Sequence, residues 1–181
     1  MKNELPTGFS YRPEFLSPPE EQELLQRAQQ LDFGEVKIRG VTARRRVAHF
    51  GWLYHYESRL IEPGPPVPEF LLPLRSRIAE LAQVKPENLC EVLVTEYPAG
   101  AGIGWHRDAP GFGLVVAVSL LGSCRLRLRR EKAALRRMAS LTLAPRSAYM
   151  LNGVARWVWQ HSIAPTRMPR YSITFRTLRS R

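Results

Sequence analysis

Cysteine is scarce in this sequence, and long apolar runs are absent. The two cysteines, Cys90 and Cys124, lie far apart and belong to no C-x-x-C motif. A disulfide framework is therefore not expected, and we predict an intracellular, cytoplasmic protein. No apolar run approaches the roughly 20 residues that cross a bilayer, and residues 1–15 lack the apolar core of a signal peptide. We therefore expect no membrane association.

Acidic residues are few relative to basic ones. Lys and Arg number 27 against 16 Asp and Glu, which gives a net charge of +11. This excess predicts a polyanionic partner, most often nucleic acid. The alternative is a basic protein without such a partner, in which the arginines reflect composition alone. The chain has 181 residues and no internal repeat, so we expect one domain, residues 1–181, acting as a monomer.

Helical signals are concentrated in the first half of the chain. Ser17 can cap a helix and Glu20 completes a capping box, and apolar residues follow at helical spacing up to Leu31. A second helix is expected over about 68–83, where Pro73 marks its start or a kink. Between them, residues 35–58 mix arginines with aromatic residues, and residues 61–68 form a proline-rich connector.

From about residue 89 the pattern changes to short strands. Residues 89–97 are rich in β-formers, 114–121 form a continuous apolar run, and 124–129 alternate leucine or cysteine with arginine. A further strand is expected over 157–161, with Trp157 and Trp159 facing inward. Helices followed by many short strands predict an α+β fold with an antiparallel sandwich or jelly roll. We divide the domain into helices and a substrate-side lid, about 1–88, and a catalytic core, about 89–181.

The segment Gly-Trp-His-Arg-Asp contains two possible metal ligands in a chain with only four histidines. His106 and Asp108 point to the same side of an extended chain, and His161 is a candidate third ligand. Two imidazoles and one carboxylate leave half of an octahedron open, as in non-haem Fe(II) oxygenases. The open positions can accept a bidentate cosubstrate and then O₂. The alternative, and the usual explanation of so short a His-x-Asp pattern, is a hydrogen-bonded pair at the surface.

The C-terminal segment 170–176 supplies a second signal. Its apolar residues alternate with Arg170, Ser172, Thr174 and Arg176. If the strand is central, its arginines face the interior, where an unpaired guanidinium is costly and requires an anion. A dicarboxylate fits, because arginine binds carboxylates through two parallel hydrogen bonds. The alternative is an edge strand with a solvent-exposed basic face.

Taken in order, these motifs resemble the AlkB family of Fe(II)- and 2-oxoglutarate-dependent dioxygenases. The resemblance extends from about residue 35 to 179 and includes the segments 96–100, 105–108, 119–121, 143–147, 160–163 and 170–176. It implies a double-stranded β-helix, or jelly roll, with N-terminal helices packed against it. It also implies that the protein uses Fe(II), 2-oxoglutarate and O₂.

The resemblance assigns roles to individual residues. The family's metal ligands correspond to His106, Asp108 and His161. Its arginine for the distal carboxylate of 2-oxoglutarate corresponds to Arg170, and its second, catalytic arginine, near the ketoacid end of the cosubstrate, corresponds to Arg176.

Four positions around the cosubstrate and substrate can be compared with the family pattern. Tyr97 keeps a tyrosine that touches 2-oxoglutarate, but Thr95 stands where many members have asparagine. Ser172 also replaces an asparagine and keeps a hydroxyl at the cosubstrate. Pro110 replaces an acidic residue that contacts the methylated base in DNA-repair members, which puts the familiar substrates N1-methyladenine and N3-methylcytosine in doubt.

The segment 41–58 resembles the family's substrate-side lid. Phosphate contacts are expected from three arginines, and stacking on a flipped base from two aromatic residues: Arg44, Arg45, Arg46, Trp52 and Tyr54. The aromatic residues can alternatively pack between lid and barrel. We also expect the arginine face of 125–129 to join residues 44–46 in a phosphate track leading to the iron.

The resemblance implies oxidative demethylation of N-alkylated bases in DNA or RNA, with single-stranded nucleic acid favoured because its bases are already unstacked. One alternative is an AlkB-like oxygenase acting on tRNA or on protein, as a demethylase or hydroxylase. Another is a nucleic-acid-binding module with a degenerate site.

Overall fold

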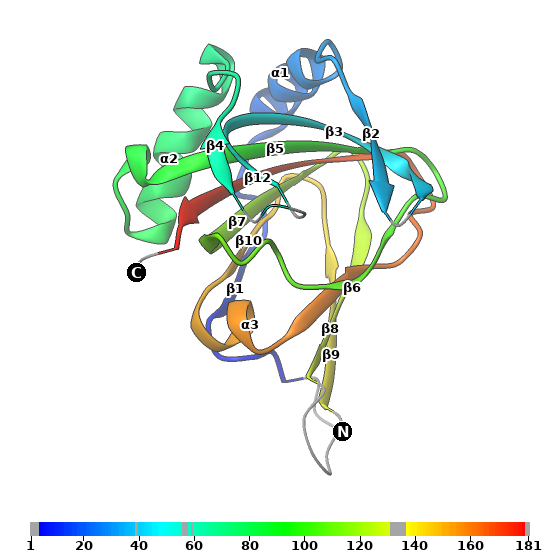
Figure 1. The fold of residues 1–181 in the computed structure, drawn as a ribbon. Helices are drawn as coiled ribbons and strands as arrows, with labels where there is room; N and C mark the ends of the chain where they lie inside the picture. Colours follow the sequence, from blue (N-terminus) through cyan, green and yellow to red (C-terminus); the bar gives the residue numbers. More distant parts are fainter. Residues whose placement is uncertain (1–3, 39, 56–57, 59, 131–136, 180–181) are drawn as a thin grey trace.

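Two antiparallel sheets face each other, and two helices cover the outer side of the larger one (Figure 1). The structure is a computed structural model, and it describes residues 4–38, 40–55, 58, 60–130 and 137–179. No helix among these residues is both long and apolar enough to cross a membrane. The α+β jelly roll expected from the sequence is confirmed.

The larger sheet has eight strands, and its inner face forms one wall of the candidate site. The strand order is β1-β10-β7-β12-β5-β3-β2, with β4 paired to β3. Strand β12 lies in the middle, between β7 and β5, so the C-terminal segment is a central strand and not an edge. The strands are β1 (Phe9–Arg12), β2 (Gly34–Ile38), β3 (Val41–Tyr54), β4 (Ile61–Pro63), β5 (Leu89–Tyr97), β7 (Phe112–Leu120), β10 (Ala148–Leu151) and β12 (Arg170–Leu178).

The smaller sheet has four strands in the order β6-β11-β8-β9. They are β6 (Ile103–His106), β8 (Cys124–Arg130), β9 (Arg137–Leu143) and β11 (Gln160–Ile163). The register pairs His161 with His106 on one side and with Leu128 on the other. The strict alternation of residues 124–129 is confirmed, because Leu126 and Leu128 are fully buried while Arg125 is exposed.

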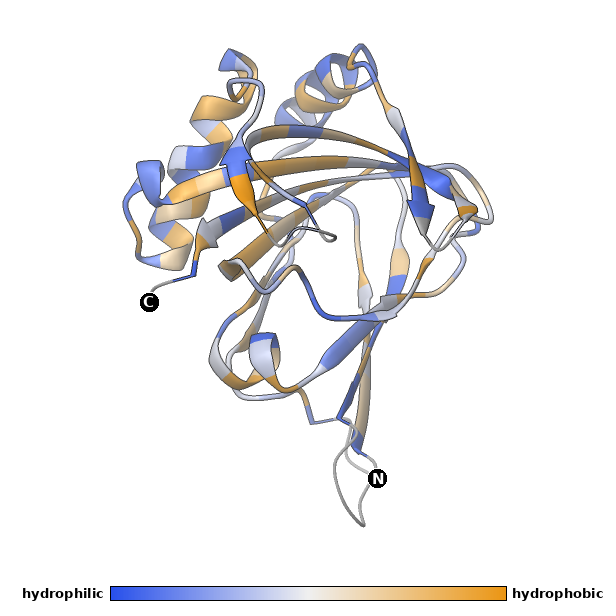
Figure 2. Cartoon of the chain, viewed as in Figure 1, coloured by the Kyte–Doolittle hydropathy of each residue, from blue (hydrophilic) through white to orange (hydrophobic). Residues whose placement is uncertain are grey.

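The helices form above the larger sheet for the reasons that the sequence indicates. Helix α1 (Pro18–Ala28) begins at the predicted capping box of Ser17 and Glu20. The second predicted helix is a short 3₁₀ turn, η1 (Glu69–Leu71), followed by α2 (Leu72–Ala82), with Pro73 in the first turn. A further 3₁₀ turn, η2 (Pro86–Asn88), leads into β5. Both helices alternate apolar and polar residues (Figure 2), as elements with one buried face do.

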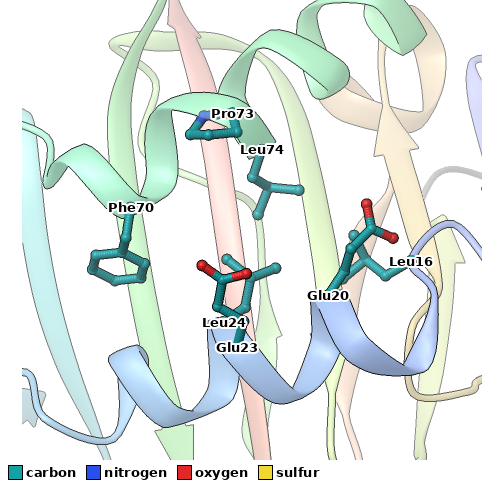
Figure 3. A pocket seen from close by; sticks show the side chains of 7 residues that line it. All are labelled: Leu16, Glu20, Glu23, Leu24, Phe70, Pro73 and Leu74. Carbon is teal, nitrogen blue, oxygen red and sulfur yellow. The ribbon is translucent and has the colours of Figure 1, made fainter.

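Two apolar cores follow from this layering. One lies between the helices and the outer face of the larger sheet, and it includes Ile78, Val94, Ile173 and Phe175. The other lies between the two sheets and includes Leu126 and Leu128. Figure 3 shows a small pocket where α1 faces α2, lined by Leu24, Phe70 and Leu74 and by two glutamates of α1. This pocket lies on the helical side of the larger sheet and is not part of the candidate site between the two sheets.

Three local expectations differ from the structure. Residues 35–58 contribute a hairpin, β2 and β3, that extends the larger sheet, and β1 pairs at its other edge. The first 88 residues therefore supply strands as well as helices and lid. The proline-rich connector includes β4, which pairs with β3. Residues 157–161 are not one strand, because α3 (Gly153–Trp157) precedes β11, and Trp157 is largely exposed while Trp159 is buried.

Candidate metal and cosubstrate site

The inner face of β12 carries a buried arginine with unused hydrogen-bonding capacity. Arg170 is fully buried, and one of its terminal nitrogens, Nη2, donates to Ser119 Oγ at 2.8 Å. Its Nε and Nη1 have no partner. Burying an unpaired guanidinium costs several kcal/mol by order of magnitude. Nη2 carries a second N–H group. Beside Nε or Nη1 it completes one edge of the guanidinium, whose two parallel N–H groups match the two oxygens of a carboxylate, so a dicarboxylate such as 2-oxoglutarate fits this position.

Hydroxyl groups and an aromatic ring surround Arg170. Its guanidinium carbon lies 5.0 Å from the ring centre of Tyr97. Burial raises the pKa of Tyr97, so its hydroxyl stays protonated. Ser172 pairs with Thr95 on one neighbouring strand and with Ser119 on the other, and all three are buried. The two predicted cosubstrate residues, Tyr97 and Ser172, therefore lie on the same face of the sheet as Arg170.

The three predicted metal ligands come together between the sheets. The imidazole rings of His106 and His161 lie 4.2 Å apart, and His161 Nε2 lies 3.5 Å from Asp108 Oδ2. Strand pairing of β6 with β11 brings the two histidines side by side, and Asp108 follows two residues after the end of β6. The Oδ2 atom of Asp108 is buried without a hydrogen-bond partner. A bound metal ion would supply the partner that this oxygen lacks.

The protonation states of these side chains suit metal binding. Burial lowers the pKa of His161 to about 4 and also lowers the pKa of His106, so both rings are neutral near pH 7. Burial raises the pKa of Asp108, but Arg176 and the two histidines outweigh it and hold this pKa well below its usual range. Neutral imidazole and ionised carboxylate are the forms that bind divalent metals.

In the part of the chain described, no group of three His, Cys, Asp or Glu side chains is already closed around one point as a formed metal site. His106 Nδ1 contacts the carbonyl oxygen of Gly104 at 2.8 Å, and Asp108 Oδ1 accepts two hydrogen bonds from Arg176. These contacts leave His106 Nε2, His161 Nε2 and Asp108 Oδ2 as the candidate ligand atoms. The metal-ligand assignment therefore stays a prediction that the geometry makes reasonable.

Arg176 links the candidate ligand to a second carboxylate that sequence reasoning missed. Its Nε and Nη2 donate to Asp108 Oδ1 at 2.9 and 2.6 Å. Its Nη1 donates to both oxygens of Glu91, at 2.8 and 2.7 Å. Glu91 is 2% exposed, and His49 Nδ1 lies 3.8 Å from its Oε1. Glu91 therefore fixes the orientation of Arg176, which in turn fixes Asp108.

The signal for Glu91 was present in the sequence. It is an isolated acidic residue in the apolar strand β5, at the same parity as Thr95 and Tyr97. Its strand partner on β3 is Gly51, whose φ is +78° and whose added Cβ would meet Cys90 O at 2.0 Å. Only glycine fits there, because β3 and β5 approach each other closely beside Glu91.

A second arginine that the sequence reasoning did not single out shapes the loop after Asp108. Arg156, on α3, is 2% exposed. It donates to the carbonyl oxygens of Ala109, Phe112 and Gly113 at 2.7–2.8 Å. Pro110 lies within this loop, so Arg156 fixes the backbone at the position where an acidic residue was expected from the family pattern.

The three lid arginines do not share one environment. Arg45 is half-buried, and its charge acts on Tyr97 and His106, so it lies toward the site. Arg46 instead pairs with Glu96 at 2.6 Å and contacts Phe33 on the helical side. Arg44 is exposed, with a guanidinium nitrogen beside Gly100. The alternation of β3 thus favours Arg45 as the site-facing member, and the expected role of Arg46 in binding phosphate conflicts with its ion pair.

The two lid aromatics also differ. Trp52 is 36% exposed and pairs along the backbone with Pro63 of β4. The ring of Tyr54 lies edge-on to Phe112 at 6.4 Å and close to Gly111. Tyr54 therefore packs between the lid and the loop after Asp108, whereas Trp52 is partly exposed.

The arginines of 125–129 lie on the outer face of the smaller sheet, because Leu126 and Leu128 occupy the inner face beside His161. They therefore do not continue the rim formed by Arg45. A single phosphate track leading from this row to the iron is contradicted by this placement.

Comparison with known proteins defines the class. Residues 8–176 match the model of the 2OG-Fe(II) oxygenase superfamily. The chain belongs to this superfamily, whose members are 2-oxoglutarate-dependent dioxygenases requiring Fe(II) and O₂.

Within this superfamily the chain is AlkB-like. It is 27% identical over 172 residues to the tRNA (carboxymethyluridine(34)-5-O)-methyltransferase ALKBH8 of Mus musculus, covering 90% of this chain and 25% of that protein. It is 27% identical over 180 residues to the alkylated DNA repair protein ALKBH8 homolog of Arabidopsis thaliana, covering 86% and 50%. The chain thus spans a quarter to a half of the length of these relatives.

Solved structures agree on the fold. The structure of OsALKBH1 superposes with a TM-score of 0.73 at 16% identity, covering 96% of this chain and 98% of that one. A prolyl-4-hydroxylase from Pseudomonas putida superposes with a TM-score of 0.64 at 15% identity, covering 95% and 93%. At these identities the likeness concerns the fold alone.

Proposed function

We propose that this chain is a 2-oxoglutarate-dependent dioxygenase that oxidatively demethylates N-alkylated bases in nucleic acid. The observation that carries the oxygenase chemistry is the buried fork of Arg170, with two unpartnered nitrogens, on the wall that faces His106, Asp108 and His161. The net charge of +11 supports a nucleic-acid substrate. So do the AlkB-like relatives, one of which is named an alkylated DNA repair protein.

The residues of the chain have distinct tasks in this proposal. His106, Asp108 and His161 would hold Fe(II), and Arg170 would hold the distal carboxylate of 2-oxoglutarate. Bound together, these two groups would supply oxidation of an N-methyl carbon, whose hydroxylated product breaks down to formaldehyde and the unmodified base in the strand. Arg176 keeps Asp108 ionised and oriented. The sheets on either side exclude water from this chemistry.

The substrate side of the proposal rests on the rim. Arg45, which is half-buried, would contact a phosphate near the target base, and the partly exposed indole of Trp52 would stack on that base. We propose single-stranded nucleic acid as the substrate form, because flipping a base from a duplex costs a few kcal/mol. We further propose that the protein acts as a monomer.

Oxidation of a tRNA base without loss of a carbon is the second candidate. Pro110 stands where an acidic base contact was expected, and the murine relative is named for a modified tRNA uridine. An N-alkyl group releases formaldehyde after hydroxylation, whereas a C-linked group keeps the new hydroxyl. The two reactions are therefore distinguished by their products.

The test is a product assay with Fe(II), 2-oxoglutarate and a panel of methylated single-stranded DNA and RNA oligonucleotides. Demethylation predicts succinate and formaldehyde in equal amounts for at least one oligonucleotide. Succinate stimulated without formaldehyde would indicate the hydroxylase. If no oligonucleotide raises succinate above the level without substrate, the nucleic-acid substrate is wrong. His161→Ala serves as the inactive control.

A further inference from the structure

The outer face of the smaller sheet carries a row of arginines that the proposed reaction does not use. Strand β8 places Arg125, Arg127 and Arg129 at every second position. Alternate residues of a strand are about 6.6 Å apart, so the row is evenly spaced. Leu128 between them is buried and pairs with His161. The row therefore points away from the candidate metal ligands.

Neutral acceptors on the neighbouring strands orient the row. The donated hydrogen bonds are Arg125 Nη2 to Ser140 Oγ at 2.6 Å, Arg127 Nε to Ser162 Oγ at 3.0 Å and Arg129 Nε to Gln160 Oε1 at 2.8 Å. A hydroxyl or an amide directs a guanidinium without cancelling its charge. Among the described residues, Arg125 and Arg127 take part in no ion pair. Their charge is therefore available to an anionic partner.

An indole supports the same row from strand β6. The guanidinium carbons of Arg127 and Arg129 lie 5.2 and 4.5 Å from the ring centre of Trp105. Stacking on an aromatic face holds a guanidinium flat and leaves its N–H edge for phosphate oxygens. Beside the row the surface is hollowed, with Arg125, Arg127 and Ser140 lining the hollow. Figure 2 shows hydrophilic segments along β8 and β11 in this region.

We propose that this arginine row is a second contact surface for the backbone of single-stranded nucleic acid, separate from the rim that admits the target base. Evenly spaced, pre-oriented guanidiniums suit a polymer with evenly spaced negative charges. The surface lies on the far side of the smaller sheet, so only a strand longer than the one filling the site reaches both. The inference rests on the proposed nucleic-acid function and adds a length dependence to it.

The test compares two double variants that remove the same charge. Arg125→Ala/Arg127→Ala changes the row, and Arg12→Ala/Arg27→Ala removes two exposed arginines outside it. Fluorescence anisotropy measures binding of oligothymidine probes of about 5 and about 30 nucleotides over a salt series. For the long probe, the row variant should flatten the log–log salt slope by about 1.4, since each single-strand phosphate contact contributes about 0.7. The control variant should keep the wild-type slope.

Charge-conserving substitutions separate this effect from misfolding. Arg125→Lys/Arg127→Lys should keep most of the slope, because counterion release depends on charge. If the lysine variant loses as much slope as the alanine variant, or if the row and control variants have equal slopes, the proposal is overturned. The proposal is also overturned if polyglutamate displaces the labelled long probe from the arginine row as well as unlabelled long probe does. That result would assign the surface to an acidic protein.

Turnover separates this proposal from the proposed function. Formaldehyde release from a short methylated oligonucleotide should fall much less in the row variant than release from a long one carrying the same base. If the wild type releases no formaldehyde from either oligonucleotide, the proposed demethylase function is wrong. The comparison of salt slopes still tests whether the arginine row binds nucleic acid. If release falls equally for both lengths, the row is not a separate surface.

Discussion

Replacing Arg170 by lysine isolates the contribution of the guanidinium fork. The positive charge remains, but only one terminal nitrogen replaces two parallel donors. In the structure, Nη2 already donates to Ser119 Oγ, while Nε and Nη1 have no partner. A carboxylate would bind along one edge of the guanidinium, where one of these two nitrogens donates beside the second N–H group of Nη2. Arg170→Lys therefore removes about one charge-assisted hydrogen bond to the cosubstrate and leaves the rest of the site unchanged.

The size of the effect follows from that count. A hydrogen bond to a charged group contributes about 1.5–3 kcal/mol. With about 1.4 kcal/mol for each factor of ten, 2-oxoglutarate should bind roughly 10- to 150-fold more weakly. Tyr97→Phe should weaken binding less, by about 1–2 kcal/mol, since it removes one hydroxyl next to Arg170. The stability of the free protein should not fall, because the wild-type guanidinium is buried without a full set of partners.

Two assays test this prediction. Succinate formation at varied 2-oxoglutarate gives the KM, and thermal unfolding with Mn(II) gives the stabilisation that 2-oxoglutarate provides. For the wild type, ligand at about 100 times its Kd should add about 2.7 kcal/mol of stability. At the same concentration Arg170→Lys should keep only about 0.3–1.4 kcal/mol of that gain. An unchanged KM together with an unchanged thermal gain would refute the placement of the cosubstrate at Arg170.

Three further predictions concern other parts of the molecule. Glu91→Gln should lower metal affinity by about 10- to 100-fold, as changes behind a metal ligand do. A Co(II) titration with the same affinity as wild type would contradict this. Arg45→Ala should lower turnover of a methylated oligonucleotide. Arg46→Ala should chiefly lose a half-exposed ion pair, at a cost of about 1 kcal/mol or less in urea unfolding. Equal losses of turnover in the two variants would contradict the assignment of Arg45 as the arginine that faces the site. Ser17→Ala should cost about 1 kcal/mol of stability through the lost helix cap, with turnover unaffected, and an unchanged unfolding midpoint would show that the cap contributes nothing.

The parts of the fold that the sequence predicted are those with a clean period. Strands β8 and β12 alternate strictly, and both present the expected faces. The sequence did not predict the hairpin of β2 and β3, because its residues mix arginines with apolar residues and show no clean alternation of burial. Helix α3 has five residues and a cap from Asn152, and it is too short to show a helical period.

Some residues of the candidate site could be predicted from the sequence, and others required the structure. Arg170 could be inferred from alternation and the cost of burying a charge. The pairing of His161 with His106 depends on strand register, which joins distant segments and was supplied by family resemblance. Glu91 was visible as a polar residue on an inward face, but its partner Arg176 lies on another strand. The directions of Arg44, Arg45 and Arg46 required the backbone of β3.

The central claim is that His106, Asp108 and His161 hold Fe(II) together with 2-oxoglutarate. The most direct measurement is an anaerobic titration of the protein with Fe(II) and 2-oxoglutarate, monitored by visible absorption. A metal-to-ligand charge-transfer band should develop at one equivalent of iron, require 2-oxoglutarate, and be absent from His161→Ala. A wild-type protein that gives no such band, or a His161→Ala protein that gives the full band, would contradict the account.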